Sequence, residues 1–291
     1  MLTFGFVMSQ PTRRAAVAGT WYPDRPEELA LEVDRYSEQV GVLIDGDIVG
    51  LVVPHAGLMY SGPVAAYAYR QVIGREYDVV VLVGPSHYVG FEGVAIYPRG
   101  AFETPFGPVA ISEADADAIA AASPIVRELP SAHAREHSLE MQLPFLQRVL
   151  PGTPIVPLVM GHQTHLTMTQ LADALVAALA DRRVLLVASS DLSHFFDARR
   201  AAKLDAVVVE AIDRFDPEAL ERALVRFPNH ACGGGPIVTV MRAARGLGAG
   251  DARVLRYADS GEVSGDKSAV VGYAAAVLGT FTAAGNTALE T

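Results

Sequence analysis

The sequence predicts an α/β fold in which helices cover both faces of a mostly parallel central sheet. Runs rich in Val, Ile and Leu alternate with longer stretches of helical periodicity along the 291 residues. These apolar runs are nearly continuous, as expected of strands that are covered on both faces. Strands that alternate with helices in this way form a three-layer sandwich with the sheet in the middle.

Six buried strands are expected in chain order, together with one strand nearer an edge. The buried strands span residues 48–54, 78–84, 93–97, 154–160, 183–189 and 268–278. The run at 253–258 alternates apolar and polar residues, which favours an edge position. Residues 90–109 contain several turn residues and few helix signals, so they are expected to form a hairpin or a strand excursion.

Helices are predicted between these strands from their start signals and their 3.6-residue periodicity. The first begins after Asp24, with Pro26 and two glutamates in its first turn. Ser112 and Asp115 resemble a capping box. Pro144 either kinks a later helix or marks its true start. The predicted helices span residues 26–40, 112–122, 137–150, 166–180, 198–214 and 217–225, and a last helix begins near Pro236.

Composition and charge limit the class of protein. With 51% hydrophobic residues and no linker or repeat, residues 11–280 are predicted to form a single domain, with flexible termini at 1–10 and 281–291. The net charge of −10 argues against a nucleic-acid surface. No apolar run approaches the roughly 20 residues that cross a bilayer. A single cysteine excludes an intrachain disulfide, so a cytoplasmic protein is expected.

Ligand-type side chains follow three of the predicted strands. His55 follows the first strand, His87 follows the second, and Asp191 and His194 follow the strand at 183–189. Because the carboxyl ends of parallel strands open onto one crevice, we expect these side chains to meet there. Histidine suits metal ligation or acid–base chemistry. Asp191 either orients His194, acts as a base itself, or caps the helix that follows.

The only cysteine, Cys232, lies in the glycine-rich turn HACGGGP, just before a predicted helix. A helix N-terminus lowers a thiol pKa and favours the thiolate, and the glycine N–H groups there could hold an anion. The alternative is a small buried apolar residue. His137 and Glu140, one turn apart on a predicted helix, are expected to line the same pocket. Imidazole, carboxylate and thiolate in one crevice indicate a metal site or a nucleophilic site.

Five ordered motifs resemble those of the Memo family: PHAGLMYSG, GPSHY, EHSLEMQLPF, SSDLSHF and NHACGGGPI. The opening AVAGTWYPDRPEEL matches the usual start of the family, and the resemblance runs from about Arg14 to Leu278. Bacterial and archaeal members are often called AmmeMemoRadiSam system protein B. That name implies a functional association with a radical-SAM protein and an AMMECR-type protein.

The resemblance implies a fold like that of class III extradiol dioxygenases. It also implies a metal site made by His55, His87 and Cys232, which would hold iron or copper, or else zinc. Asp191 and His194 are implied to line the same pocket. The extradiol enzymes hold iron with two histidines and a glutamate, so a cysteine in place of the glutamate leaves dioxygenase activity open.

Three functions therefore remain. The first is a metal-binding protein with a redox-linked role, and the second is an extradiol-type dioxygenase in which His194 is the acid–base group. The third is a non-enzymatic scaffold for a peptide or an anion. In each case the expected ligand is a small molecule or a peptide bound in the crevice.

Overall fold

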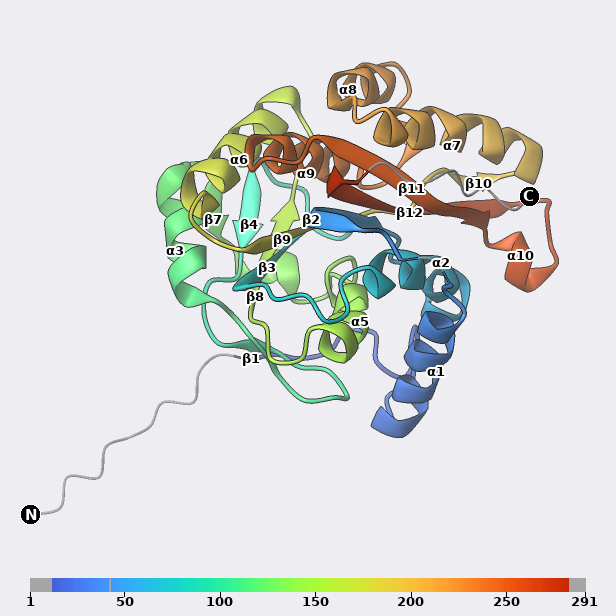
Figure 1. The fold of residues 1–291 in the computed structure, drawn as a ribbon, viewed down its shortest axis with the longest axis horizontal. Helices are drawn as coiled ribbons and strands as arrows, with labels where there is room; N and C mark the ends of the chain where they lie inside the picture. Colours follow the sequence, from blue (N-terminus) through green and yellow to red (C-terminus); the bar gives the residue numbers. More distant parts are fainter. Residues whose placement is uncertain (1–11, 42, 283–291) are drawn as a thin grey trace, which may run out of the picture.

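A nine-stranded sheet runs through the middle of the protein in a computed structural model that describes residues 12–41 and 43–282 (Figure 1). In spatial order the strands are β10 (His194–Phe196), β12 (Val270–Phe281), β2 (Gly46–Val53), β9 (Val184–Ser189), β3 (Val79–Pro85), β8 (Ile155–Met160), β4 (Val94–Ile96) and β7 (Val126–Glu128), with β11 (Asp251–Asp259) paired to β12. The predicted strands are all present, and the edge position expected for 253–258 is confirmed by β11.

The sheet is mixed, so the prediction of a mostly parallel sheet is wrong. The four strands β2, β9, β3 and β8 are parallel neighbours. By contrast, β12 is antiparallel to β2, β10 and β11, and β4 is antiparallel to β8. A helical crossover returns the chain parallel to the previous strand, whereas a short connection such as that between β11 and β12 reverses it.

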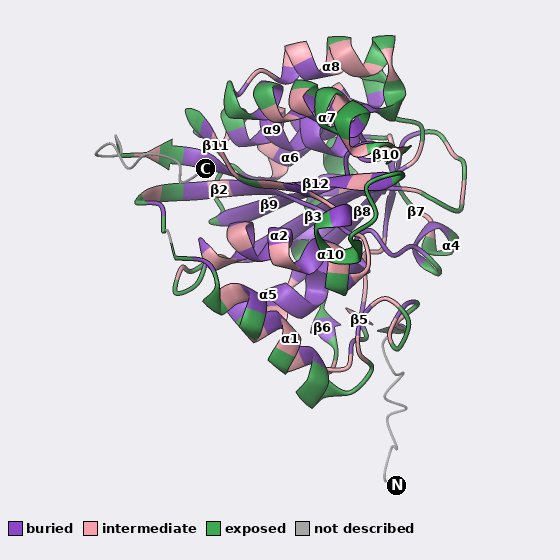
Figure 2. Cartoon of the chain, turned by 90° about the vertical axis from the view of Figure 1, so that its right-hand side faces the viewer, coloured by how far each residue is buried: buried purple, intermediate pink, exposed green. Residues whose placement is uncertain are grey.

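Helices lie on both faces of this sheet, which confirms the α/β class (Figure 2). One face is covered by α1 (Pro26–Glu38), α2 (Leu58–Arg70) and α5 (Leu143–Val149). The other is covered by α6 (His165–Leu179), α7 (Ala198–Asp213), α8 (Pro217–Arg226) and α9 (Gly234–Gly246). The helix α3 (Glu113–Ala122) packs against α6.

Short elements complete the described chain. The strands β1 (Thr12–Arg13), β5 (Ala101–Phe102) and β6 (Val109–Ala110) form a separate small sheet, in which β5 and β6 are the hairpin expected within 90–109. The helices α4 (Pro130–His133) and α10 (Gly261–Ser264) are each one turn long.

The predicted helix at 137–150 is shorter in the structure. It begins at Leu143 after a 3₁₀ turn at Glu140–Gln142, and Pro144 occupies its first turn. Proline lacks the N–H that a helix interior needs but fits the first turn, where that N–H is unpaired in any case. Pro144 therefore marks the true start of the helix, and His137 lies before it in an irregular segment.

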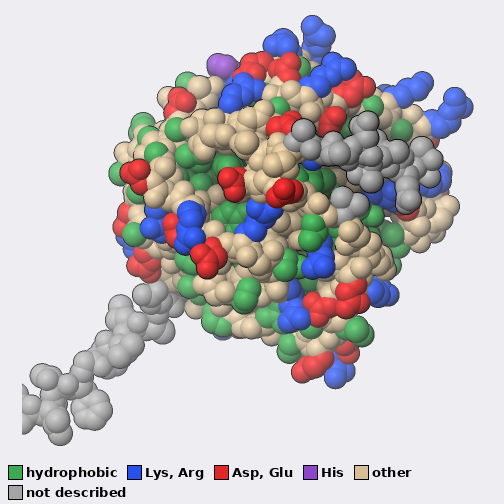
Figure 3. All heavy atoms as spheres, viewed as in Figure 1, with side chains coloured by type: hydrophobic (Ala, Val, Ile, Leu, Met, Phe, Trp, Pro, Cys, Tyr) green, Lys and Arg blue, Asp and Glu red, His purple; other side chains and the backbone are tan. Residues whose placement is uncertain are grey.

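Every residue of β3, β8 and β9 is buried, which explains their continuous apolar sequences. On the face seen in Figure 3, acidic and basic side chains are interspersed over the surface. No helix within 12–41 and 43–282 is long and apolar enough to cross a membrane. The predicted flexible termini lie outside the described residues, except that β12 extends to Phe281.

Candidate functional site

Three neighbouring parallel strands end at the same edge of the sheet and place the candidate residues there. His55 lies two residues beyond β2, His87 two beyond β3 and Asp191 two beyond β9. Since β9 pairs with both β2 and β3 in parallel, with Val53 opposite Ser189, the three loops leave the sheet side by side (Figure 1).

His55, His87 and Cys232 come together at this edge. The Sγ atom of Cys232 lies 3.3 Å from Nε2 of His55, although 177 residues separate them. The ring centroids of His55 and His87 are 5.2 Å apart. One donor atom from each of the three residues lies within 4.8 Å of the others. These are the two imidazoles and the thiol that the sequence singled out.

A buried hydrogen-bond network sets the tautomer of His55. The Ser189 hydroxyl donates to the carbonyl oxygen of Ser138 (2.6 Å) and accepts from Nε2 of Gln142 (2.7 Å). Its only proton is therefore used, so at the 2.8 Å contact with His55 Nδ1 it accepts. His55 carries its proton on Nδ1, and its Nε2 lone pair faces Cys232. Burial lowers the pKa of His55 well below its ordinary value, which keeps the ring neutral.

Glu136, which sequence reasoning missed, holds His87. Its carboxylate accepts from the His87 backbone N–H (2.6 Å), from His87 Nδ1 (2.8 Å) and from the Ser138 N–H (2.9 Å). Burial works to raise the pKa of Glu136, but the hydrogen bonds that the carboxylate accepts from His87 and Ser138 outweigh burial and lower that pKa to about 2. An ionised carboxylate only accepts, so His87 also carries its proton on Nδ1 and leaves Nε2 free. Metal-binding histidines are commonly oriented by a carboxylate in this way.

The thiol of Cys232 differs from the prediction. The helix α9 begins only at Gly234, and the Cys232 N–H donates to the carbonyl oxygen of Asp191 (3.2 Å). Burial, and then the nearby Asp191 carboxylate, raise the pKa of the Cys232 thiol. The expected lowering of the thiol pKa by a helix N-terminus is therefore wrong for the metal-free protein. The thiol keeps its proton at neutral pH, and its Sγ lies 3.3 Å from Nε2 of His55 and 3.5 Å from the carbonyl oxygen of Asp191.

Asp191 and His194 are near one another in sequence but have different partners. The Oδ1 atom of Asp191 accepts from the backbone N–H groups of residues 55 and 56, at 2.7 and 3.2 Å. His194 donates from Nδ1 to the carbonyl oxygen of Leu192 (2.8 Å), so that carbonyl, and not Asp191, orients the ring. The helix α7 is capped by Asp197, so a capping role for Asp191 is also wrong. Asp191 instead fixes the loop that carries His55.

Asp205 on α7 is a second carboxylate that the sequence analysis overlooked. It is fully buried, accepting from the Ser193 N–H (2.9 Å) and the Tyr257 hydroxyl (2.8 Å). Gly272 on β12 leaves room for it: a Cβ there would lie 2.0 Å from Oδ2 of Asp205. The backbone just before His194 is thus anchored to α7. An aspartate on the buried face of an amphipathic helix was the signal that could have revealed this role.

His137 belongs to the histidine cluster. Its ring stacks on that of His87 with centroids 4.4 Å apart, and the Trp21 ring lies tilted against it at a centroid distance of 4.3 Å. Burial, followed by the neighbouring His55 and His87, lowers the pKa of His137 to about 4. A neutral imidazole at this position adds to the polar wall beside His87.

Glu140 has a different role from the one expected. It pairs with Arg13 and accepts from the Tyr22 hydroxyl (2.6 Å) and from the N–H groups of residues 16 and 17. These contacts fasten the N-terminal segment that brings Trp21 to His137. The two side chains therefore have different partners: His137 packs against His87 and Trp21, whereas Glu140 contacts the N-terminal segment.

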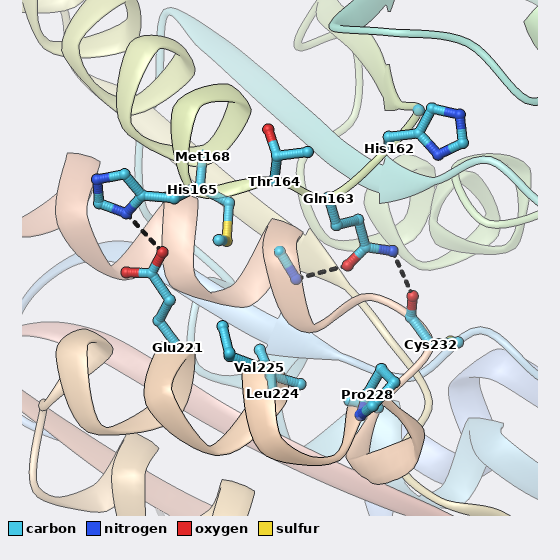
Figure 4. Close-up of a pocket in the computed structure, with 13 residues that line it drawn as sticks. His162, Gln163, Thr164, His165, Met168, Glu221, Leu224, Val225, Pro228 and Cys232 are labelled. Carbon is cyan, nitrogen blue, oxygen red and sulfur yellow. Dashed lines mark hydrogen bonds and ion pairs between the residues drawn. The ribbon is translucent and has the colours of Figure 1, made fainter.

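Two cavities adjoin Cys232. One, of about 410 Å³, is lined by His87, Leu192, His194, Phe195, Pro228, Asn229, Ala231 and Cys232. The other, of about 480 Å³, lies along α6 and α8 and includes Met168 and Leu224 (Figure 4). There Gln163 donates to the Cys232 carbonyl oxygen and accepts from the Gly235 N–H, both at 2.7 Å, and so holds the glycine-rich turn in place.

Comparison with known proteins identifies the family. The sequence profile of the Memo-like proteins matches residues 13–277. The chain belongs to the Memo family. A MEMO1 family protein of Thermotoga petrophila is 37% identical over 281 residues, covering 91% of this chain and 99% of the relative. Those of Methanosarcina mazei and Methanocaldococcus jannaschii are 38% and 36% identical, covering 91% of this chain and 98% of each relative.

Proposed function

We propose that this Memo-family protein binds a transition-metal ion through His55, His87 and Cys232 and has a redox-linked role in the cytoplasm. The observation that supports this proposal is the convergence of two imidazoles and a thiol from three separate loops, with donor atoms within 4.8 Å of one another. Both histidines are held as the Nδ1–H tautomer, so both Nε2 lone pairs are available. Mixed imidazole and thiolate ligands suit iron, copper and zinc.

The donor set favours iron or copper over zinc, because a redox-linked role needs a metal with two accessible oxidation states. Such a metal, when bound, would supply Lewis acidity or electron transfer. Within the chain, Ser189 and Glu136 hold the two imidazoles in place. His194 has a free Nε2 and lines the same cavity, where it can accept or donate a proton at a bound ligand.

The test is the metal content of protein purified without oxygen. Iron, copper and zinc are measured by mass spectrometry for the wild type, His55→Ala, His87→Ala and Cys232→Ser, with His162→Ala, at an exposed histidine, as the matched control. We expect one metal per chain in the wild type and the control, and a metal content about tenfold lower or less in the other three, because each has lost a ligand. Equal metal content in Cys232→Ser removes the thiol from the ligand set.

A second candidate is an extradiol-type dioxygenase, favoured by the position of His194 beside His87 and Cys232 in one cavity. Iron-loaded protein is incubated with a panel of catechols while oxygen uptake and ring-cleavage absorbance are followed. Turnover that falls at least a hundredfold in His194→Gln supports this activity. Absence of turnover across the panel leaves the metal-binding proposal standing alone.

A further inference from the structure

Phe195 has a backbone conformation that disfavours bulky residues. Its φ angle is +64°, in the left-handed region. Among the described non-glycine residues only Phe215 shares a positive φ. Phe215 ends α7, where the N–H of Asp216 donates back to the carbonyl oxygen of Ala211, and its ring is 8% exposed. Phe195 ends no helix, and its ring is 79% exposed.

The neighbours of Phe195 impose this conformation. In the pairing of β10 with β12, His194 lies opposite Val271 and Phe196 opposite Val270, so Phe195 is an extra residue in a bulge. On one side His194 is anchored through Nδ1 to the Leu192 carbonyl oxygen (2.8 Å). On the other side the Arg200 guanidinium lies 4.4 Å from the ring centre of Phe196. The bulge therefore turns the Phe195 ring away from the core.

Phe195 is one of the residues that line the 410 Å³ cavity, together with His87, His194 and Cys232. Strained residues that the surrounding structure over-determines are concentrated at functional sites. Of the other wall residues, Leu192, Pro228 and Ala231 are apolar and Asn229 is polar. A volume of this size lies in the range of small-molecule sites. The cavity thus combines apolar side chains with the polar groups of His87, His194 and Cys232.

We propose that Phe195 is a ligand-binding residue that stacks on an apolar, ring-sized group of a small molecule, whose polar end lies toward His87, His194 and Cys232. The proposal rests on the proposed function only in sharing its cavity, because the apolar contact does not require a metal. It assigns to the site a substrate class with one flat apolar part and one polar part. An exposed aromatic face favours such a group through offset stacking.

The test uses two fluorinated probes, 4-fluoroanisole (apolar ring) and trifluoroacetamide (polar), titrated against the protein and followed by ¹⁹F NMR. Titrations are made both on protein as purified and after metal removal. We expect 4-fluoroanisole to bind the wild type more tightly than trifluoroacetamide and to slow maleimide labelling of Cys232. In Phe195→Ala its affinity falls about fivefold to tenfold, which corresponds to the loss of one aromatic contact. Leu31→Ala, at an equally exposed apolar side chain on α1 (72% exposed), leaves the affinity unchanged.

Equal affinity in Phe195→Ala and the wild type, or labelling of Cys232 that the probe does not slow, overturns the proposal. A second variant, Phe195→Gly, tests the strained backbone of residue 195 separately from the loss of the aromatic contact. Phe195→Gly relieves the positive φ, so it should melt at the same or a higher temperature than Phe195→Ala while binding the probe equally weakly. A lower melting temperature for the glycine variant contradicts the strained conformation. The titrations are also made after metal removal. Their outcome therefore does not depend on whether the protein binds a metal.

Discussion

Nε2 of His55 and Sγ of Cys232 lie 3.3 Å apart, and in the metal-free protein the pair is neutral. The imidazole has its proton on Nδ1, and the thiol keeps its own. A metal ion that binds both atoms must displace the thiol proton, so metal binding should release a proton and weaken as the pH falls.

The first prediction concerns the reactivity of Cys232. Since burial and Asp191 raise its pKa, alkylation of the metal-free protein by iodoacetamide should be slow at pH 7 and rise about tenfold per pH unit up to pH 10. Asp191→Asn removes the nearby negative charge and should shift the profile toward lower pH. The chain has one cysteine, so the labelled site is unambiguous. A rate that levels off near neutral pH would show that the thiol pKa is ordinary or low.

The second prediction concerns Gln142, which is buried behind the site. Gln142→Leu removes the donor to Ser189 and leaves the Tyr69 hydroxyl and the Pro54 carbonyl oxygen without this partner. We expect destabilisation by about 1–3 kcal/mol per unsatisfied group, measured by urea unfolding. The ¹⁵N signals of His55 should remain those of the Nδ1–H tautomer, because Ser189 still donates its proton to the Ser138 carbonyl oxygen. Finding the Nε2–H tautomer in the wild type contradicts the proposed network.

The third prediction concerns the contribution of Glu136 to the free energy of unfolding, which should depend on pH. Its pKa is lowered to about 2 in the folded protein from an ordinary value of 4.5. The stability that it contributes is therefore complete above about pH 4.5 and is lost as the pH falls toward 2. It amounts to something on the order of 3 kcal/mol. Glu136→Gln should flatten the fall in unfolding free energy across this window, whereas Glu128→Gln, at an exposed position on β7, should not. Parallel curves for Glu136→Gln and the wild type would refute the depressed pKa.

The fourth prediction concerns Gly272, which lies against Asp205. An alanine Cβ at this position would lie 2.0 Å from Oδ2 of the carboxylate, so Gly272→Ala must displace a buried charged group. We expect destabilisation of about 3 kcal/mol and a changed NMR signal for His194, whose backbone Asp205 supports. Gly250→Ala is the matched control, because a Cβ at that glycine meets no atom within 4 Å. If Gly272→Ala has the same stability as the wild type, the Asp205 carboxylate has room to move.

The sequence was sufficient to predict the longer strands and the residues that meet at their ends, but not the short strands β1, β7 and β10. Continuous apolar runs such as that of β3 carry a strong signal, and the loops after parallel strands must share one edge. The antiparallel addition of β12 was missed, because its alanine-rich run resembles any buried strand. The direction of a strand depends on its connection, which periodicity does not encode.

The residues that orient the site were harder to predict than the residues in it. Glu136 contacts His87, which is 49 residues away along the chain, and Gln142 contacts Ser189, which is 47 residues away. Neither stands out by spacing, although both lie in or beside the motif EHSLEMQLPF that carried the family resemblance. The thiol pKa of Cys232 was predicted with the wrong sign, because sequence suggested a helix end but not the burial that dominates it.

The position of β12 also ties the two sides of the site together. This strand lies between β2 and β10, so it joins the strand that leads to His55 with the strand that begins at His194. A change that shifts the register of β12 would therefore move both walls of the crevice at once.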